Sequence, residues 1–316
     1  MFVKVSLVIT CLNEESTINW LLEGLLNQIV LPAEIIFVDG GSKDQTKKII
    51  TGWKKNKIIG KKIKLLTKKG NRSVSRNYGI GKAKYRWIAI TDAGCIPHQN
   101  WLGELINTQQ QSKSSVIAGY YAGLPRTRFQ QAVIPYALVM PDRINSKKFL
   151  PASRSMMINK KIWQQIGKFD KTLNYNEDYA LAKKIERANI PIAFAEQAIV
   201  FWLPRKNLID FWKMVDLFAL GDIQAGIIRP KVILIFMRYL FFFSLLTWVL
   251  IKGNLSATGS FFPSLILLYF IWAILKNKRY TPQSWWWLPI LQIAADLAVM
   301  NGSLKGFLAR RGQLQS

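Results

Sequence analysis

Four short strand-like segments within the first 92 residues each end at a polar residue, and helical patterns lie between them. The segments cover residues 5–10, 34–39, 62–67 and 86–91, and apolar side chains recur at helical spacing from Ile18 to Leu26. Strands that alternate with helices favour a mostly parallel sheet with helices on both faces. The sequence therefore predicts an α/β domain, a class in which ligands bind just outside the carboxyl ends of the strands.

Polar side chains follow these strands at the point where each strand ends. Asn13 comes after the first strand, Asp39 ends the second, and Asp92 follows the fourth, which Gly94 stops. Because the carboxyl ends of parallel strands meet at one edge of a sheet, we expect the three side chains to lie close together. Each could also be a turn residue that hydrogen-bonds its own backbone, and both interpretations stay open at this point.

Composition limits the chemistry of the chain. The 316 residues contain 44 Lys and Arg against 18 Asp and Glu, a net charge of +26. This excess predicts an anionic partner, either nucleic acid, a phosphorylated substrate or an acidic membrane face. His98 is the single histidine, which argues against a His-rich zinc site and a Ser-His-Asp triad. Cys11 and Cys95 have no Cys-x-x-Cys partner, so we expect free, buried thiols in a reducing compartment.

The common phosphate-binding motifs do not occur. The chain has no GxxxxGK[ST], and Gly79-Ile-Gly81 lacks the third glycine of a dinucleotide fingerprint. Instead, Val38-Asp-Gly-Gly-Ser42 places an acid and two glycines between a strand and a helix. The acid can accept hydrogen bonds from a base or a ribose, and the glycines allow a ligand to approach the backbone closely.

Several of these segments together resemble the family 2 glycosyltransferases. They occur in the family's order and spacing over about residues 3–205, and they are Thr10-Cys-Leu-Asn-Glu14, Val38-Asp-Gly-Gly-Ser-Lys-Asp44, Gly70 through Asn77, Thr91-Asp-Ala-Gly94 with Pro97, and Asn176-Glu-Asp178. The resemblance implies the GT-A fold, which is a Rossmann-like, mostly parallel sheet with flanking helices. It also implies a nucleotide-diphosphate sugar as donor, a divalent metal, Mg²⁺ or Mn²⁺, and inversion at the anomeric carbon.

The resemblance also implies roles for individual residues. The residues that it places at the nucleotide sugar are Thr10, Asn13, Glu14, Asp39, Gly41, Arg76 and Asp92. Among them Asp39 resembles the acid that binds uracil, and Asp92 resembles the metal ligand. Asp178 resembles the general base, and we expect Glu177 and Trp202 on the acceptor side.

The chain departs from the family's pattern at the metal motif. Gly94 stands where the second Asp of Asp-x-Asp is usual, so Asp92 is the single carboxylate there. One carboxylate together with substrate phosphates can hold Mg²⁺. The departure also leaves an alternative open, a membrane-anchored pseudo-glycosyltransferase that binds nucleotide without turnover. The chain lacks the Gln-x-x-Arg-Trp of processive synthases, which favours transfer of a single sugar.

A second alternative concerns Asp178. Asn176 is a good N-cap for a helix that begins near Glu177, and acids in the first turn complement the helix dipole. Asp178 could therefore serve the helix rather than the reaction. An inverting displacement, by contrast, needs a base that reaches the acceptor hydroxyl.

Beyond about residue 205 the composition changes. We expect a catalytic domain over residues 1–205 and, over 206–230, an amphipathic helix that lies at a membrane interface or packs on the catalytic domain. Membrane-anchoring helices follow over 231–316. Apolar runs at 232–251 and 255–275 are long enough to span a bilayer, with a turn at 252–254. Asp296 interrupts a third run at 285–308, which we interpret as a re-entrant or interfacial segment or a third span.

Basic residues indicate how the chain meets the membrane. The loop at 276–279 is basic, so the positive-inside rule predicts a multi-pass protein of the cell inner membrane with its catalytic domain in the cytoplasm. Lysine pairs are spread over the catalytic half, which favours anionic membrane lipids as partners. We expect no nucleic-acid partner because no reading element is found. A lipid-linked or cell-envelope glycan is the expected acceptor.

Overall fold

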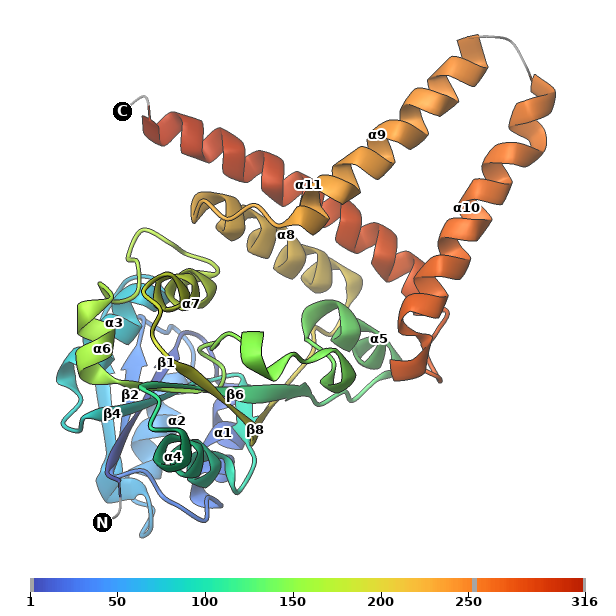
Figure 1. Cartoon of the computed structure of the whole chain (residues 1–316). Coiled ribbons are helices and arrows are strands. Elements are labelled where there is room, and N and C mark those ends of the chain that lie inside the picture. Colours follow the sequence, from blue (N-terminus) through green and yellow to red (C-terminus); the bar gives the residue numbers. More distant parts are fainter. Residues whose placement is uncertain (1–2, 252–254, 315–316) are drawn as a thin grey trace. The chain divides into compact units, whose positions relative to one another are not determined.

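The computed structural model describes residues 3–251 and 255–314, which form two compact units (Figure 1). Unit 1 comprises Met1–Leu124 and Val139–Leu203, and unit 2 comprises Pro125–Leu138 and Pro204–Ser316. The short segment 125–138 therefore belongs with the C-terminal part of the chain, although it lies inside the stretch assigned to the catalytic domain from sequence. The turn predicted at 252–254 lies outside the described residues.

Unit 1 is built on an eight-stranded sheet with the strand order β3-β2-β1-β4-β7-β6-β8-β5. The strands are β1 (Val5–Cys11), β2 (Glu34–Asp39), β3 (Ile63–Thr67), β4 (Trp87–Asp92), β5 (Cys95–Pro97), β6 (Val116–Gly123), β7 (Met156–Asn159) and β8 (Ile192–Trp202). Strands β1 to β4 pair in parallel, as the alternating sequence pattern predicts. Strand β7 runs antiparallel to both of its neighbours, and β5 runs antiparallel to β8.

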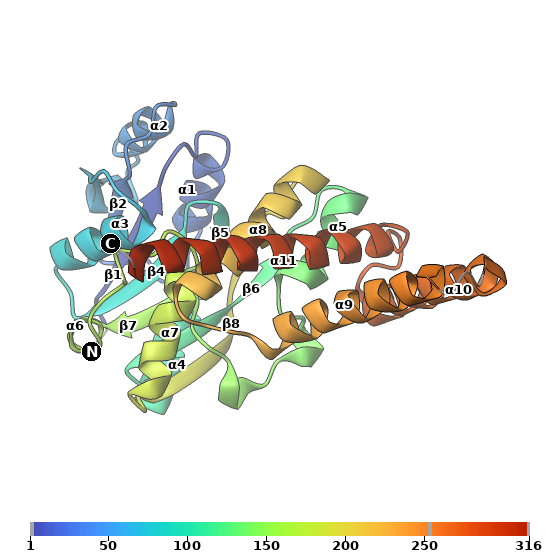
Figure 2. The ribbon, with the colours of Figure 1, turned by 90° about the horizontal axis from the view of Figure 1, so that it is seen from above.

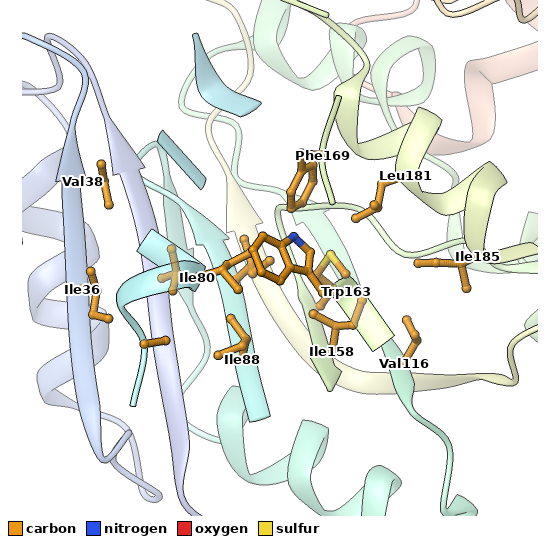
Figure 3. Close-up of a cluster of buried hydrophobic side chains, with 14 residues drawn as sticks. Ile36, Val38, Ile80, Ile88, Val116, Ile158, Trp163, Phe169, Leu181 and Ile185 are labelled. Atoms are coloured by element: carbon orange, nitrogen blue, oxygen red, sulfur yellow. The ribbon is translucent and has the colours of Figure 1, made fainter. Parts of the chain in front are cut away.

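Helices flank this sheet. Those of unit 1 are α1 (Ile18–Leu26), α2 (Thr46–Trp53), α3 (Arg72–Lys82), α4 (Trp101–Ser112), α6 (Lys160–Gln165) and α7 (Glu177–Arg187), with short 3-10 turns at Gly60–Lys62, Pro141–Arg143 and Ser146–Lys148. One buried cluster joins α3, α6 and α7 to the sheet, and Trp163 of α6 lies at its centre, with Ile80, Ile88 and Ile158 around it (Figure 3). Alternate residues of each strand supply this face, as the two-residue period of a strand requires.

Helix α3 approaches the sheet unusually closely at Gly79. A Cβ atom added at this position would lie 2.7 Å from Cγ1 of Val8 and 2.8 Å from Cγ2 of Val38, distances that real Cβ contacts do not show. Glycine therefore lets the helix rest directly on β1 and β2. This close packing matters for the site, because Arg76 lies one turn earlier on the same helix.

Unit 2 consists of helices. They are α5 (Arg128–Ala137), α8 (Leu208–Gln224), α9 (Pro230–Ile251), α10 (Leu255–Asn277) and α11 (Trp287–Leu314), with a 3-10 turn at Lys278–Tyr280. Helices α8 and α11 pack backbone to backbone at two glycines: a Cβ at Gly302 would lie 2.0 Å from the Asp216 carbonyl oxygen, and one at Gly306 would lie 2.7 Å from Cβ of Ile223. Asp216 also accepts a hydrogen bond from Asn301 at 2.6 Å.

Two helices of unit 2 have the length and composition of membrane spans. They are Pro230–Ile251 and Phe261–Tyr280, with mean hydropathies of 2.1 and 1.3 in their most apolar windows. Few side chains in these windows are buried by the protein, 6% and 17% respectively. Helices α9 and α10 run in opposite directions as a hairpin (Figures 1 and 2). Length and apolar exposure agree with the two predicted spans, and crossing itself remains a prediction.

The third apolar run is one uninterrupted helix. Helix α11 passes through Asp296 without a break, so the chain does not turn back there as a re-entrant segment would. Asp296 does interrupt the apolar run, but its carboxylate is paired. Its carboxylate accepts hydrogen bonds from Arg238 of α9, from the Tyr269 hydroxyl of α10 at 2.5 Å and from Gln292 at 3.0 Å. A buried carboxylate with these partners ties three helices together.

This pairing gives a stability prediction. Asp296→Asn should lower the free energy of unfolding of the full chain in detergent by about 1.5–3 kcal/mol, because bonds to a charged group have that net value and Arg238 loses its counter-charge. Asp210→Asn on α8 is the matched control, since that carboxylate bonds its near neighbour Asn207. Thermal unfolding measures both, and equal melting temperatures for the two variants would contradict the proposed role of Asp296.

Candidate functional site

The strand pairing brings the predicted polar residues to one edge of the sheet. Strand β1 lies between β2 and β4: its Cys11 pairs with Asp39 of β2, and its Thr10 pairs with Asp92 of β4. The two aspartates therefore lie on either side of the end of β1, about 10 Å apart across two strand spacings. Asn13 follows at the same edge. The structure thus places the three polar residues together, while their roles remain predictions.

The loops after β1 and β2 are hydrogen-bonded to each other. Asn13 has a left-handed backbone with φ of 55°, which asparagine tolerates better than most residues. Its N–H donates to the Ser42 hydroxyl at 2.9 Å, and its side-chain oxygen accepts from the Lys43 N–H at 2.9 Å. The Glu14 N–H donates to the Thr46 hydroxyl at 2.8 Å. These bonds fix the loop edge before any ligand arrives, and one of them uses the side-chain oxygen of Asn13.

Asp39 is buried, and its carboxylate closes the turn that follows β2. It accepts hydrogen bonds from the N–H groups of Gly41 at 3.0 Å and Ser42 at 3.2 Å. Gly41 has a φ of 109°, which explains why glycine stands there. The turn interpretation of this motif is thus realised. A carboxylate offers about four lone-pair positions, so it still has capacity for a base or ribose hydroxyl.

Arg76 forms the buried centre of the site. Its Nη2 donates to Oδ1 of Asp92 at 2.7 Å, and its Nη1 pairs with Glu177 at the start of α7. Its guanidinium also lies 5.5 Å from the ring centre of Phe169. The Arg76 side chain is 2% exposed and pairs with two carboxylates, while its predicted role near the nucleotide stays a prediction. It connects the end of β4 to the start of α7.

The charge of Asp92 follows from its surroundings. Burial alone would raise the pKa of this carboxyl, but the positive charges of Arg76, Arg72 and Arg154 outweigh burial and hold the pKa below its usual range. The group is therefore ionised at neutral pH. Because the pKa is lowered on folding, its contribution to stability is present above the unfolded pKa of about 4 and is lost as the pH falls further.

The segment from Gly70 to Asn77 holds the approach to α7. Asn77 exchanges two hydrogen bonds with the backbone of Phe169, at 2.8 and 3.1 Å. Asn71 accepts from the Val74 N–H at 3.0 Å as the N-cap of α3, and its amide donates to the Lys171 carbonyl at 2.7 Å. This stretch of the family resemblance therefore works here by fixing the loop that leads to Asp178.

Asp178 lies in the first turn of α7, held by three hydrogen bonds. Its Oδ2 accepts from the N–H and the hydroxyl of Ser153, both at 3.2 Å, and its Oδ1 accepts from the Tyr179 N–H at 2.8 Å. The expected cap is wrong, because Asn176 has a left-handed backbone with φ of 54° and its side chain makes no capping bond. A capping side chain requires an extended backbone to reach the first turn.

Arg154 is a feature of the site that sequence reasoning missed. Its guanidinium lies 5.3 Å from the ring centre of Tyr121 and 5.2 Å from that of Trp202. Trp202, expected on the acceptor side, stands on β8 opposite Cys95 of β5 and Gly123 of β6. The sequence offers only an arginine between two serines before a strand. That signal does not distinguish a site residue from a surface residue.

The residues at this edge offer a metal few ligands. In the ranges 3–251 and 255–314, no group of three or more His, Cys, Asp and Glu side chains gathers as a metal cluster. Cys11 and Cys95 are free and buried, as predicted, and burial raises the pKa of both thiols to about 12, which keeps them protonated. Asp92 is 32% exposed. Its carboxylate fits a cation that donor phosphates also bind, as Mg²⁺ commonly is.

The family model described as Glycosyl transferase family 2 matches residues 6–169. The chain belongs to this family. It is 24% identical over 228 residues to a poly-β-1,6-N-acetyl-D-glucosamine synthase of Staphylococcus epidermidis, covering 69% of this chain and 54% of that one. It is 26% identical over 151 residues to the poly(ribitol-phosphate) β-N-acetylglucosaminyltransferase TarP of Staphylococcus aureus, covering 45% of each. The chain thus spans about half the length of these curated relatives.

Solved structures show the same fold. Residues 1–349 of S. aureus TarS, in complex with UDP-GlcNAc, share 18% identity at a TM-score of 0.52, over 98% of this chain and 92% of that one. The mannosyltransferase PcManGT from Pyrobaculum calidifontis, in complex with GDP-Man and Mn²⁺, shares 17% identity at a TM-score of 0.65, over 96% and 87%. The predicted GT-A fold and family membership are confirmed.

The Arg76 bridge predicts a matched pair of variants on α7. Glu177→Gln removes one of the two charges that balance a buried guanidinium, and it should cost about 1.5–3 kcal/mol of the free energy of unfolding. Glu186→Gln should cost less than about 1 kcal/mol, because its ion pair with Lys183 is largely solvent-exposed. Denaturant unfolding of the full chain compares them. Equal losses would mean that the bridge does not hold α7.

Proposed function

We propose that this chain is an inverting glycosyltransferase that moves a single sugar from a nucleotide-diphosphate sugar to a lipid-linked or cell-envelope acceptor at the cytoplasmic face of the cell inner membrane. One observation carries the proposal: the buried Arg76 joins Asp92, at the edge expected to bind the donor, to the start of the helix that bears Asp178. The carboxylates of Asp92 and Asp178 are thus held at one site in different environments, as donor binding and proton removal require.

The donor side is formed by the ends of β1, β2 and β4. The hydrogen-bonded loops that contain Asn13 and Gly41, together with Asp39, bind the nucleoside. Asp92, together with the donor phosphates, would hold a divalent cation, and that cation would neutralise the charge of the leaving diphosphate. The names of the solved neighbours make UDP-GlcNAc and GDP-mannose the first donors to test, with Mn²⁺ as the first metal.

Asp178 acts as the general base. It takes the proton of the acceptor hydroxyl as that oxygen attacks the anomeric carbon, and the bond from this carbon to the diphosphate breaks on the opposite side, which inverts the configuration. Ser153 fixes the carboxylate through two hydrogen bonds, so the base meets the acceptor already oriented. Glu177 keeps Arg76 neutralised, and Trp202 contributes an apolar surface on the acceptor side.

A second candidate is a pseudo-glycosyltransferase that binds nucleotide without turnover. Gly94 in place of a second aspartate favours it, as does the pairing of Asp92 with Arg76. Release of the sugar from the donor distinguishes the two functions. Transfer or hydrolysis of a nucleotide sugar by the full chain supports the enzyme, and binding without either supports the alternative.

The C-terminal part anchors the enzyme. Helices α9 and α10 cross the inner membrane as a hairpin, and their outward side chains, such as Leu240 and Phe241 at 70% exposed each, face lipid. The region 206–230 lies at the interface, and anionic lipids attract the basic surface. Within unit 2, α8 of this region packs on α11.

The general-base role predicts a loss of kcat much larger than the accompanying loss of stability, which is expected because the Asn amide can accept only one of the two backbone N–H bonds made to Asp178. Asp178→Asn keeps the side-chain shape but removes the proton-accepting charge, and kcat should fall about 10²- to 10⁴-fold with donor affinity retained. Asp142→Asn, an exposed carboxylate of the same unit, should keep wild-type kcat. The measurements are kcat, donor Kd and melting temperature. A lowered melting temperature with near-normal kcat would return Asp178 to a purely structural role at the helix start.

The anchoring role predicts how the full chain fractionates. Because a spanning hairpin is held by apolar contact with lipid, the protein should stay with pelleted membranes through an alkaline carbonate wash and come off only in detergent. Anionic vesicles should bind it more strongly than neutral ones at low salt. Release by carbonate alone would show that the chain sits on the surface, and two spans would then be wrong.

A further inference from the structure

Arg154 has no role in the proposed reaction, although it lies between Asp92 and Asp178. Its carbonyl oxygen accepts a hydrogen bond from the hydroxyl of Thr91, the residue before Asp92, at 2.8 Å. The preceding residue, Ser153, bonds Asp178 at 3.2 Å. Backbone contacts on both sides therefore hold Arg154 between the donor carboxylate and the proposed base.

The guanidinium of Arg154 is held by aromatic rings rather than by an acid. Tyr121 and Trp202 lie 5.3 and 5.2 Å from it, distances at which a cation is attracted to a ring face. Within the described part of the chain, Arg154 forms no ion pair, whereas Arg76 pairs with two carboxylates. Its hydrogen-bond donors therefore remain available to an anionic ligand.

The group that must lie between Asp92 and Asp178 is the donor's diphosphate with its sugar. A diphosphate carries at least two negative charges. Because Gly94 replaces the second aspartate of the metal motif, the chain has one carboxylate fewer there to bind a metal that would neutralise those charges. A planar guanidinium binds two phosphate oxygens at once and stays charged at any working pH.

We propose that Arg154 is a diphosphate-binding residue whose guanidinium, close to the rings of Tyr121 and Trp202, bonds the donor phosphates directly. The inference rests on the proposed donor site and deepens it. It means that nucleoside diphosphates bind this chain even without a divalent metal, because part of the neutralising charge belongs to the protein.

Binding of UDP and GDP to the full chain in detergent, measured by calorimetry in excess EDTA, tests this. Arg154→Gln should raise the Kd of the better-bound nucleotide about 10- to 100-fold, the range for losing bonds to a charged group. Arg154→Lys should recover part of the loss, since lysine restores the charge without the planar fork. Arg86→Gln is the matched control, an arginine beside the Trp87 ring at the opposite end of β4.

Three outcomes would overturn the proposal. They are wild-type nucleotide affinity in Arg154→Gln, an equal loss in Arg86→Gln, and no binding of either nucleotide to the wild-type chain without metal. A loss of affinity that Arg154→Lys does not recover at all, with a lowered melting temperature, would assign Arg154 a structural role and also count against it. Failure of the proposed enzyme is distinct, because nucleotides would then bind and follow this pattern while no sugar left the donor.

Discussion

The site depends on one buried guanidinium. Arg76 is removed from water, and such a charge is tolerated only with partners, which Asp92 and Glu177 supply. The pairing joins three separate pieces of chain: a helix, the end of a parallel strand and the start of a second helix. Gly79 makes it possible, because it lets α3 settle onto the sheet close enough for Arg76 to reach the strand end. The expected donor side and the proposed base are thus positioned by the same contact.

The strand-end placement of Asn13, Asp39 and Asp92 could be predicted because parallel pairing is a regular consequence of alternating strand and helix patterns. The hydrogen-bond partners of these side chains could not be predicted. Asn13 bonds the neighbouring loop and Asp39 closes its own turn, and local backbone bonds of this kind compete with ligands for the same oxygens. The left-handed backbone of Asn176 could not be predicted from the sequence either, because the preference for asparagine at N-caps describes residues with an extended backbone.

Other features depend on contacts between residues far apart in the sequence. Arg154 meets Tyr121 and Trp202 only because β6 and β8 pair in the sheet, and no local pattern marks the arginine as special. Asp296 looked like an interruption of an apolar run, yet Arg238, 58 residues away, neutralises it and α11 continues. In both cases the residues that contact the charged side chain decide its structural role. A sequence shows the charge but not the partner.

The central claim is that nucleotide sugar binds where β1, β2 and β4 end, beside the α7 base. Hydrogen–deuterium exchange of the full chain in detergent, with and without saturating nucleoside diphosphate, tests it most directly. Exchange should slow in residues 12–17, 40–46, 91–95 and 153–155, because a bound ligand stabilises the segments that it contacts, and it should stay unchanged in α9 and α10. Saturating binding that leaves those four segments unprotected, or that protects only unit 2, would contradict the claim.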